Sequence, residues 1–251
     1  MVRSFLIIGQ SNMAGRGLIE NARPLNDNNG KIKVLRNGRW QTIFRPVNPD
    51  RSFAGTCLAE DFALAYSLAN PDVEVGIIPC ADGGTNLDQW LPNTLLFDNA
   101  IFNAKLAMRT SHLSGILWHQ GEADTLDELY PLYLEKLSII MTELRRDLGE
   151  DLPIVVGGLG DFLATRELNP FLKNYVRIND ALINFSKTFP RVAFASAEGL
   201  TCNPDQLHFN ADSLKEFGLR YFKAFESIED KSKNYNQIKL DDSKRTEMEL
   251  L

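Results

Sequence analysis

The chain has 251 residues, of which 44% are hydrophobic and 24% are charged, and its formal net charge is −6. This composition is typical of a folded protein with a large core, and it excludes wholesale disorder. The acidic balance and the absence of a long Lys or Arg run exclude a protein that binds along a nucleic-acid backbone.

Neither a membrane partner nor a secretion signal is expected. The first apolar run, residues 5–8, is shorter than the roughly 7–15 residues of a signal peptide's apolar region, and no run approaches the ~18 residues of a membrane helix. Cys57, Cys80 and Cys202 are odd in number and widely spaced, which favours reduced thiols over disulfides or zinc ligands. We therefore expect a cytoplasmic protein.

Short apolar runs alternate with helical patterns along the chain. The runs lack polar alternation, as is typical of parallel strands covered on both faces, and they span 4–8, 73–79, 115–118, 152–156 and 192–195. Apolar residues at helical spacing predict helices over 54–70, 101–108, 131–148, 175–185 and 214–225. This order predicts a three-layer α/β/α fold around a central, parallel, five-stranded sheet. We expect one domain over 1–229 and a charged tail over 230–251.

Ser11 is the first candidate for a chemical role. Ligands of open α/β sheets bind beyond the carboxyl ends of the strands, and the segment 9–17, GQSNMAGRG, follows the first run. A Ser at a strand-to-helix turn exposes its hydroxyl beside free backbone N–H groups, which suits a nucleophile. The alternative is an ordinary helix cap. Met13 stands where an α/β-hydrolase elbow needs Gly, which argues against that fold.

His208 is the candidate base. In the sequence Asp205-Gln206-Leu207-His208, the spacing allows the carboxylate to bind Nδ1 of the imidazole, which leaves Nε2 free to accept a hydroxyl proton. This short pattern is a weak signal by itself. His112 lies in a polar connector, and His119 has no acid placed as Asp205 is placed before His208.

Two further loops follow predicted strands. After the second run, Gly83 and Gly84 allow the backbone to approach a ligand closely, although a plain tight turn is the alternative. After the third run comes WHQGEAD, residues 118–124, in which the Gln120 amide is able to donate to an oxyanion and Glu122 to orient its neighbours. The alternatives for this segment are a surface loop or a metal site, but its spacing matches no metal motif.

Together these loops resemble the SGNH hydrolase superfamily, and within it the branch of sialate O-acetylesterases and family-6 carbohydrate acetyl esterases, which includes acetylxylan esterases. The resemblance covers roughly residues 2–226. It rests on the segments 9–13, 83–85, 118–122 and 205–208 and on their order along the chain. It implies a flavodoxin-like SGNH fold and a carboxylic ester hydrolase that needs no metal or organic cofactor.

The resemblance also implies roles. Ser11 is the implied nucleophile, His208 the base and Asp205 the acid that orients it. The implied oxyanion hole combines the N–H groups of Ser11 and Gly84 with the Gln120 side chain, and Gly83 is the alternative to Gly84. The implied pocket and supporting residues are Gln10, Asn12, Gly83, Thr85, His119 and Glu122.

The implied substrate is a small acetylated carbohydrate, such as an acetylated xylo-oligosaccharide, with O-acetylated sialic acid as an alternative. Two rival classes stay open. One is a non-catalytic carbohydrate-binding protein, and Trp90 and Trp118 could stack on sugars in either case. The other is a metal-dependent hydrolase that uses Asp205, His208 and His119. We expect specificity to lie in the loops 19–29, 37–53 and 87–97.

Overall fold

A seven-stranded sheet, ordered β3-β2-β4-β1-β5-β6-β7, runs through the computed structural model, which describes residues 1–229. Five of its strands correspond to the predicted apolar runs, and they are β1 (Val2–Gly9), β4 (Glu74–Pro79), β5 (Ser111–His119), β6 (Ile154–Gly157) and β7 (Val192–Ala195). These five strands pair with one another in parallel, as predicted.

The predicted number of strands, five, is wrong, because a hairpin adds two further strands at one edge of the sheet. β2 (Ile32–Arg36) pairs in parallel with β4 and antiparallel with β3 (Arg39–Thr42). Asn37 and Gly38 join the two strands, and both have positive φ, the geometry that an Asn-Gly hairpin turn requires. The hairpin was missed because β3 is largely exposed and therefore has no apolar run.

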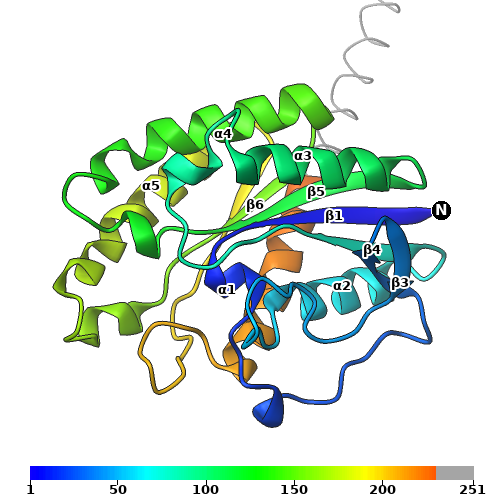
Figure 1. The fold of residues 1–251 in the computed structure, drawn as a ribbon, viewed down its shortest axis with the longest axis horizontal. Coiled ribbons are helices and arrows are strands. Elements are labelled where there is room, and N and C mark those ends of the chain that lie inside the picture. The colour runs from blue at the N-terminus through cyan, green and yellow to red at the C-terminus, as the bar shows by residue number, and fades with distance from the viewer. Residues whose placement is uncertain (230–251) are drawn as a thin grey trace, which may run out of the picture.

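Helices cover both faces of the sheet, which confirms the three-layer α/β/α prediction. Figure 1 shows α3 (Leu95–Met108), α4 (Tyr133–Leu148) and α5 (Tyr175–Thr188) on one face. The other face is covered by α2 (Leu58–Ala69) and by a helix that the structure describes over residues 211–229.

The core consists of two apolar layers, one on each face of the sheet. Adjacent side chains of a strand point to opposite faces, so β1 contributes Leu6 and Ile8 to one layer and Phe5 and Ile7 to the other. All four side chains are fully buried. A central strand buried on both faces fixes the position of the loop that follows it.

The remaining elements are short. α1 (Ser11–Ala14) follows β1, and 3₁₀ turns span Ile19–Asn21, Leu87–Trp90, Glu122–Asp124, Tyr130–Leu132, Asp161–Thr165 and Pro170–Asn174. α2 begins at Leu58 rather than at residue 54, because Thr56 forms a β-bridge with Gly17. The predicted tail, 230–251, lies outside the described residues. No helix within residues 1–229 combines the length and apolarity needed to cross a membrane.

Gly9→Ala should destabilise the protein strongly. Gly9 has φ +127°, and a Cβ there would lie 2.0 Å from the carbonyl oxygen of His119. Backbone strain and this clash together should lower the free energy of unfolding by about 3 kcal/mol or more, as measured by urea denaturation. Gly30 has φ +77°, but a Cβ added there would meet no atom within 4 Å, so Gly30→Ala should cost only about 1–2 kcal/mol. Equal losses in the two variants would contradict the role given to the clash.

Candidate active site

The loops that follow the central strands meet at one edge of the sheet. β1 lies between β4 and β5, and all three are parallel, so their carboxyl ends face the same way. Gly9 is in register with His119, and the Asp82 N–H donates to the carbonyl of Gly9. Ser11, Gly83 and Gln120 therefore follow directly from three adjacent strand ends, the usual ligand position in such sheets.

The structure brings Ser11, His208 and Asp205 into one hydrogen-bonded line. His208 Nε2 lies 2.9 Å from Ser11 Oγ, and His208 Nδ1 lies 2.6 Å from Asp205 Oδ2. An ionised carboxylate accepts hydrogen bonds only, so Nδ1 carries the proton and Nε2 is free to accept the one on Ser11. This is the relative placement that the sequence predicted.

The Asp205 carboxylate is also bound by its own loop. Oδ1 accepts the backbone N–H groups of Leu207, at 2.9 Å, and His208, at 3.0 Å. Partial burial pushes the pKa of Asp205 upward, but the His208 ring and these N–H groups outweigh it and hold that pKa below its usual value. Asp205 is therefore ionised at neutral pH and able to stabilise an imidazolium.

Two backbone N–H groups in the loops that follow β1 and β4 have no acceptor within residues 1–229. They belong to Ser11, in the first turn of α1, and to Gly84, which has φ +78° and is exposed. The Gly83 N–H, predicted as the alternative donor, is already used, because it donates to Asp50 Oδ2 at 2.9 Å. Of the two glycines, Gly84 has the free donor.

Gln120 is not placed as predicted. Its side chain is fully buried, and Nε2 lies 3.0 Å from the Thr85 carbonyl, 2.5 Å from Asp124 Oδ2 and 3.2 Å from Gln10 Oε1. Because the Thr85 carbonyl accepts only, the NH₂ group has to face it, and both amide hydrogens are consumed by protein acceptors. In this arrangement Gln120 offers no free donor to an oxyanion and instead holds the loop that carries Gly84.

The other supporting residues fix the same loops. Gln10 Oε1 lies 3.4 and 3.3 Å from the N–H groups of Gly121 and Ala123, and Thr85 Oγ1 accepts the Trp90 indole N–H at 3.0 Å. Burial raises the pKa of Asp124 to about 6, although that carboxylate accepts from Gln120 and from the Leu87 N–H. These contacts join the loops after β1, β4 and β5 into one polar network.

His119 and Glu122 lie side by side at the end of β5. His119 is fully buried, packs edge-on against Phe217, and places Nε2 3.5 Å from Glu122 Oε1. Within residues 1–229, no three His, Cys, Asp or Glu side chains are grouped as a metal site requires, so neither metal arrangement considered from the sequence is assembled. His119 is a core residue and does not contact Ser11 through any hydrogen bond of the described chain.

A cavity of about 360 Å³ lies in front of Ser11 and His208. Its size is within the range of small-molecule sites. The lining also includes three arginines that are not among the predicted site residues, namely Arg16, Arg51 and Arg166. A larger cavity, about 970 Å³, lies at the other end of the strands, where Ser111 and Pro153 line it, and contains none of the predicted site residues.

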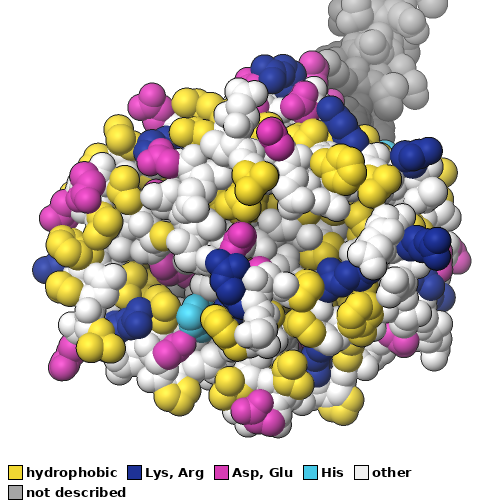
Figure 2. Space-filling view, in the orientation of Figure 1, with side chains coloured by type: hydrophobic (Ala, Val, Ile, Leu, Met, Phe, Trp, Pro, Cys, Tyr) yellow, Lys and Arg dark blue, Asp and Glu magenta, His cyan; other side chains and the backbone are white. Residues whose placement is uncertain are grey.

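Ion pairs build one wall of the cavity. Arg16 binds both carboxylate oxygens of Asp50, at 3.0 and 2.6 Å, and Arg51 pairs with Asp82 at 2.8 Å. Arg166 forms no ion pair within residues 1–229, and its Nε is buried without a hydrogen-bond partner. On the face shown in Figure 2, basic and acidic side chains are likewise intermixed rather than gathered into one patch.

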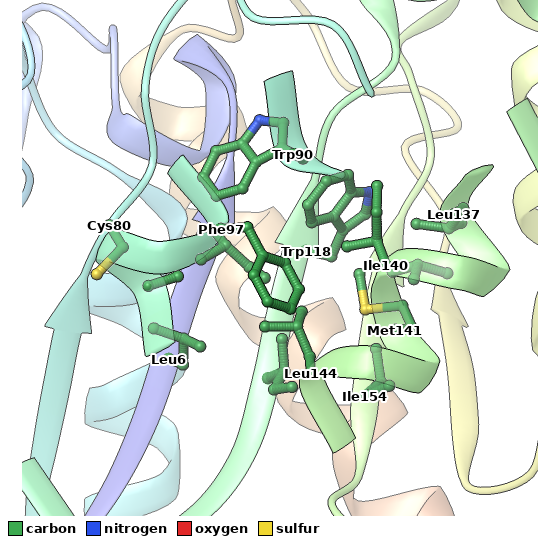
Figure 3. Close-up of a cluster of buried hydrophobic side chains, with 14 of the residues drawn as sticks. Leu6, Cys80, Trp90, Phe97, Trp118, Leu137, Ile140, Met141, Leu144 and Ile154 are labelled. Atoms are coloured by element: carbon green, nitrogen blue, oxygen red, sulfur yellow. The ribbon is translucent and has the colours of Figure 1, made fainter. Parts of the chain in front are cut away.

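The prediction that Trp90 and Trp118 stack on sugars is wrong, because both are buried in the core. Trp90 is 1% exposed and Trp118 is 0% exposed, and their rings pack edge-on at 5.7 Å. Figure 3 shows both indoles within a cluster that includes Phe97, Ile140 and Met141.

The exposed aromatic residue at the cavity comes from the predicted specificity loop 37–53. It is Phe53, 70% exposed, whose ring lies 5.2 Å from the Arg16 guanidinium. The other two predicted specificity loops, 19–29 and 87–97, contribute no residue to this lining.

Comparisons with known proteins agree with this architecture. A probable carbohydrate esterase of Arabidopsis thaliana is 26% identical in an alignment that covers 88% of this chain and 89% of that protein. An X-ray structure of an Arabidopsis thaliana protein matches with a TM-score of 0.79 and 24% identity, over 90% of this chain and 98% of the other.

A crystal structure of a carbohydrate acetylesterase from Xanthomonas citri matches with a TM-score of 0.67 and 20% identity, over 90% of this chain but 56% of the other. These two structural matches establish the shared fold. Residues 2–227 also match the family described as "Carbohydrate esterase, sialic acid-specific acetylesterase". The chain therefore belongs to this family of carbohydrate esterases.

Proposed function

We propose that this protein is a serine esterase that removes O-acetyl groups from carbohydrates through an acetyl-Ser11 intermediate. The observation that carries the proposal is the unbroken hydrogen-bonded line from Asp205 through His208 to Ser11. The line ends at a cavity whose volume is typical of small-molecule sites, and the family of carbohydrate esterases supplies the substrate class.

In the first half of the reaction, His208 Nε2 takes the proton of Ser11 as Oγ attacks the acetyl carbonyl carbon. The carbonyl oxygen becomes an oxyanion, and we assign its stabilisation to the free N–H groups of Ser11 and Gly84, two residues that line the cavity. The C–O bond to the sugar then breaks, and the sugar alkoxide leaves with the proton from His208. Acetyl-Ser11 remains.

In the second half, water replaces the sugar. His208 takes a proton from the water as its oxygen attacks the acetyl carbon, and the bond to Ser11 Oγ breaks with return of that proton to Oγ. Acetate is released. Asp205 stays ionised throughout and stabilises the positive imidazolium in each half-reaction, consistent with its lowered pKa.

Ser11→Ala should lower kcat for p-nitrophenyl acetate by at least about 10³-fold, because no other hydroxyl is bound to His208 Nε2 within the described chain. Initial rates followed by nitrophenolate absorbance test this. Ser138→Ala, on the outer part of α4, removes a half-buried hydroxyl away from the cavity and is the matched control. Turnover close to wild type in Ser11→Ala would refute the proposed nucleophile.

Labelling with a fluorophosphonate probe distinguishes the proposed esterase from a non-catalytic carbohydrate-binding protein. The proposed esterase should be labelled at Ser11, because the same activated hydroxyl attacks phosphorus. A pure binding protein should show no labelling and no acetate release.

An O-acetylated acidic sugar is a second candidate substrate, and Arg166 is the observation that favours it. The other two guanidinium groups at the cavity are neutralised by Asp50 and Asp82, whereas Arg166 has no carboxylate partner within residues 1–229. A substrate carboxylate would supply that partner through a charge-assisted hydrogen bond. The family description, which names sialic acid, supports the same substrate class.

Arg166→Gln should raise KM for O-acetylated sialic acid by about 10-fold or more and leave KM for acetylated xylo-oligosaccharides within about two-fold. A hydrogen bond to a charged group contributes about 1.5–3 kcal/mol, and only the acidic substrate makes it. Steady-state kinetics on the two substrates measure the difference, and the neutral substrate is the internal control. An equal change for both would exclude Arg166 as the carboxylate partner.

A further inference from the structure

Asn12 connects the turn that carries Ser11 to the loop that carries His208. Its Oδ1 accepts the N–H of Phe209 at 3.1 Å, and its Nδ2 donates to the carbonyl of Leu207 at 3.2 Å. These two residues flank His208 directly. A single side chain, one position after Ser11, therefore holds the backbone on both sides of the proposed base.

The other backbone hydrogen bonds of residues 207–209 come from within their own loop. Asp205 Oδ1 accepts the N–H groups of Leu207 and His208, and the Asn203 N–H donates to the carbonyl of His208 at 2.8 Å. Such bonds set the shape of the loop but not its distance from Ser11. Within residues 1–229, Asn12 is the only side chain from outside this loop that bonds this stretch of backbone.

Glu122 fixes the orientation of the Asn12 amide. Glu122 Oε1 accepts from Asn12 Nδ2 at 2.5 Å, and both side chains are buried. Burial pushes the pKa of Glu122 upward, but His119 and Asn12 outweigh it and hold that pKa below its usual value, so the carboxylate is ionised and only accepts. The amide nitrogen must face it, which leaves Oδ1 facing the Phe209 N–H.

We propose that Asn12 and Glu122 are a pair of positioning residues that hold His208 Nε2 within hydrogen-bonding distance of Ser11 Oγ. This inference rests on the proposed roles of Ser11 and His208. Neither member of the pair bonds the Ser11 hydroxyl or the His208 ring, and the pair acts through the backbone of residues 207–209. Removing it leaves Ser11, His208 and Asp205 chemically unchanged but allows the backbone around His208 to move relative to α1.

Asn12→Ala should lower kcat for p-nitrophenyl acetate by about 10- to 100-fold and leave KM within about two-fold, because a displacement of reacting groups by about 1 Å costs up to about 10² in rate. The value of kcat is calculated per active site. The number of active sites is counted by complete fluorophosphonate labelling, so that misfolded protein is not included. The rate of that labelling should fall in parallel with kcat.

Asn179→Ala is the matched control. The side chain of Asn179 likewise binds the backbone of Leu159, because it accepts the Leu159 N–H at 2.7 Å and donates to the Leu159 carbonyl at 3.0 Å. Asn179 does not line the cavity. Asn179→Ala should lower the melting temperature without lowering kcat per active site. A kcat loss shared by Asn12→Ala and Asn179→Ala would overturn the proposal, and so would an unchanged kcat in Asn12→Ala.

Two nearly isosteric variants test the pair without creating a cavity. Asn12→Asp places a carboxylate against Glu122, and the repulsion should lower kcat at least as much as Asn12→Ala does. Adding Glu122→Gln restores a donor–acceptor contact between the two side chains, and kcat should recover at least 3-fold over Asn12→Asp alone. If the pair acted on stability alone, kcat would not recover in the double variant. A missing recovery would therefore overturn the proposed pairing of Asn12 with Glu122.

The outcomes separate this inference from the proposed function. If Ser11→Ala is inactive and Asn12→Ala is fully active, the esterase mechanism stands and the positioning role is wrong. If Ser11→Ala turns over normally, the proposed function fails, and the positioning role fails with it.

Discussion

The hydrogen bond between Ser11 Oγ and His208 Nε2 joins residues 197 positions apart, and the rest of the site depends on it. Ser11 follows the central strand β1, whereas His208 comes after β7, at the edge of the sheet. The segment after β7 must therefore reach back across the strand ends. Its anchor is Phe209, which is fully buried and packs against the rings of Phe162 and Phe217. The apolar core thus places the polar site, because the residue next to the proposed base is itself a core residue.

A second constraint acts on the opposite side of Ser11, through Asp50. This carboxylate binds the Arg16 guanidinium and the Gly83 N–H together, so it joins the segment after α1 to the loop after β4. A buried ion pair loses hydration, and the two guanidinium contacts and the backbone donor offset that loss. The consequence for the site is local. With the Gly83 donor consumed, the free N–H of this glycine pair is the one on Gly84.

The sequence was sufficient to predict structural features that depend on short spacing or on buried apolar runs. The four residues from Asp205 to His208, the glycine-rich segment around Ser11 and the five apolar strands are features of this kind. It was insufficient where a residue's role depends on distant neighbours. The amide of Gln120 is used up by Thr85 and Asp124, and the local sequence does not show which acceptors surround an amide. Trp90 and Trp118 look the same in a sequence whether they stack on a ligand or, as here, fill the core.

In the proposed mechanism, Ser11 carries the acetyl group between the two half-reactions. The most direct measurement is rapid acid quenching of the protein during turnover of an acetyl ester, followed by proteolysis and mass spectrometry. One added acetyl group should appear on the peptide that contains Ser11 and should disappear as the substrate is exhausted. Steady release of acetate with no acetyl group on Ser11 at any quench time would contradict this mechanism.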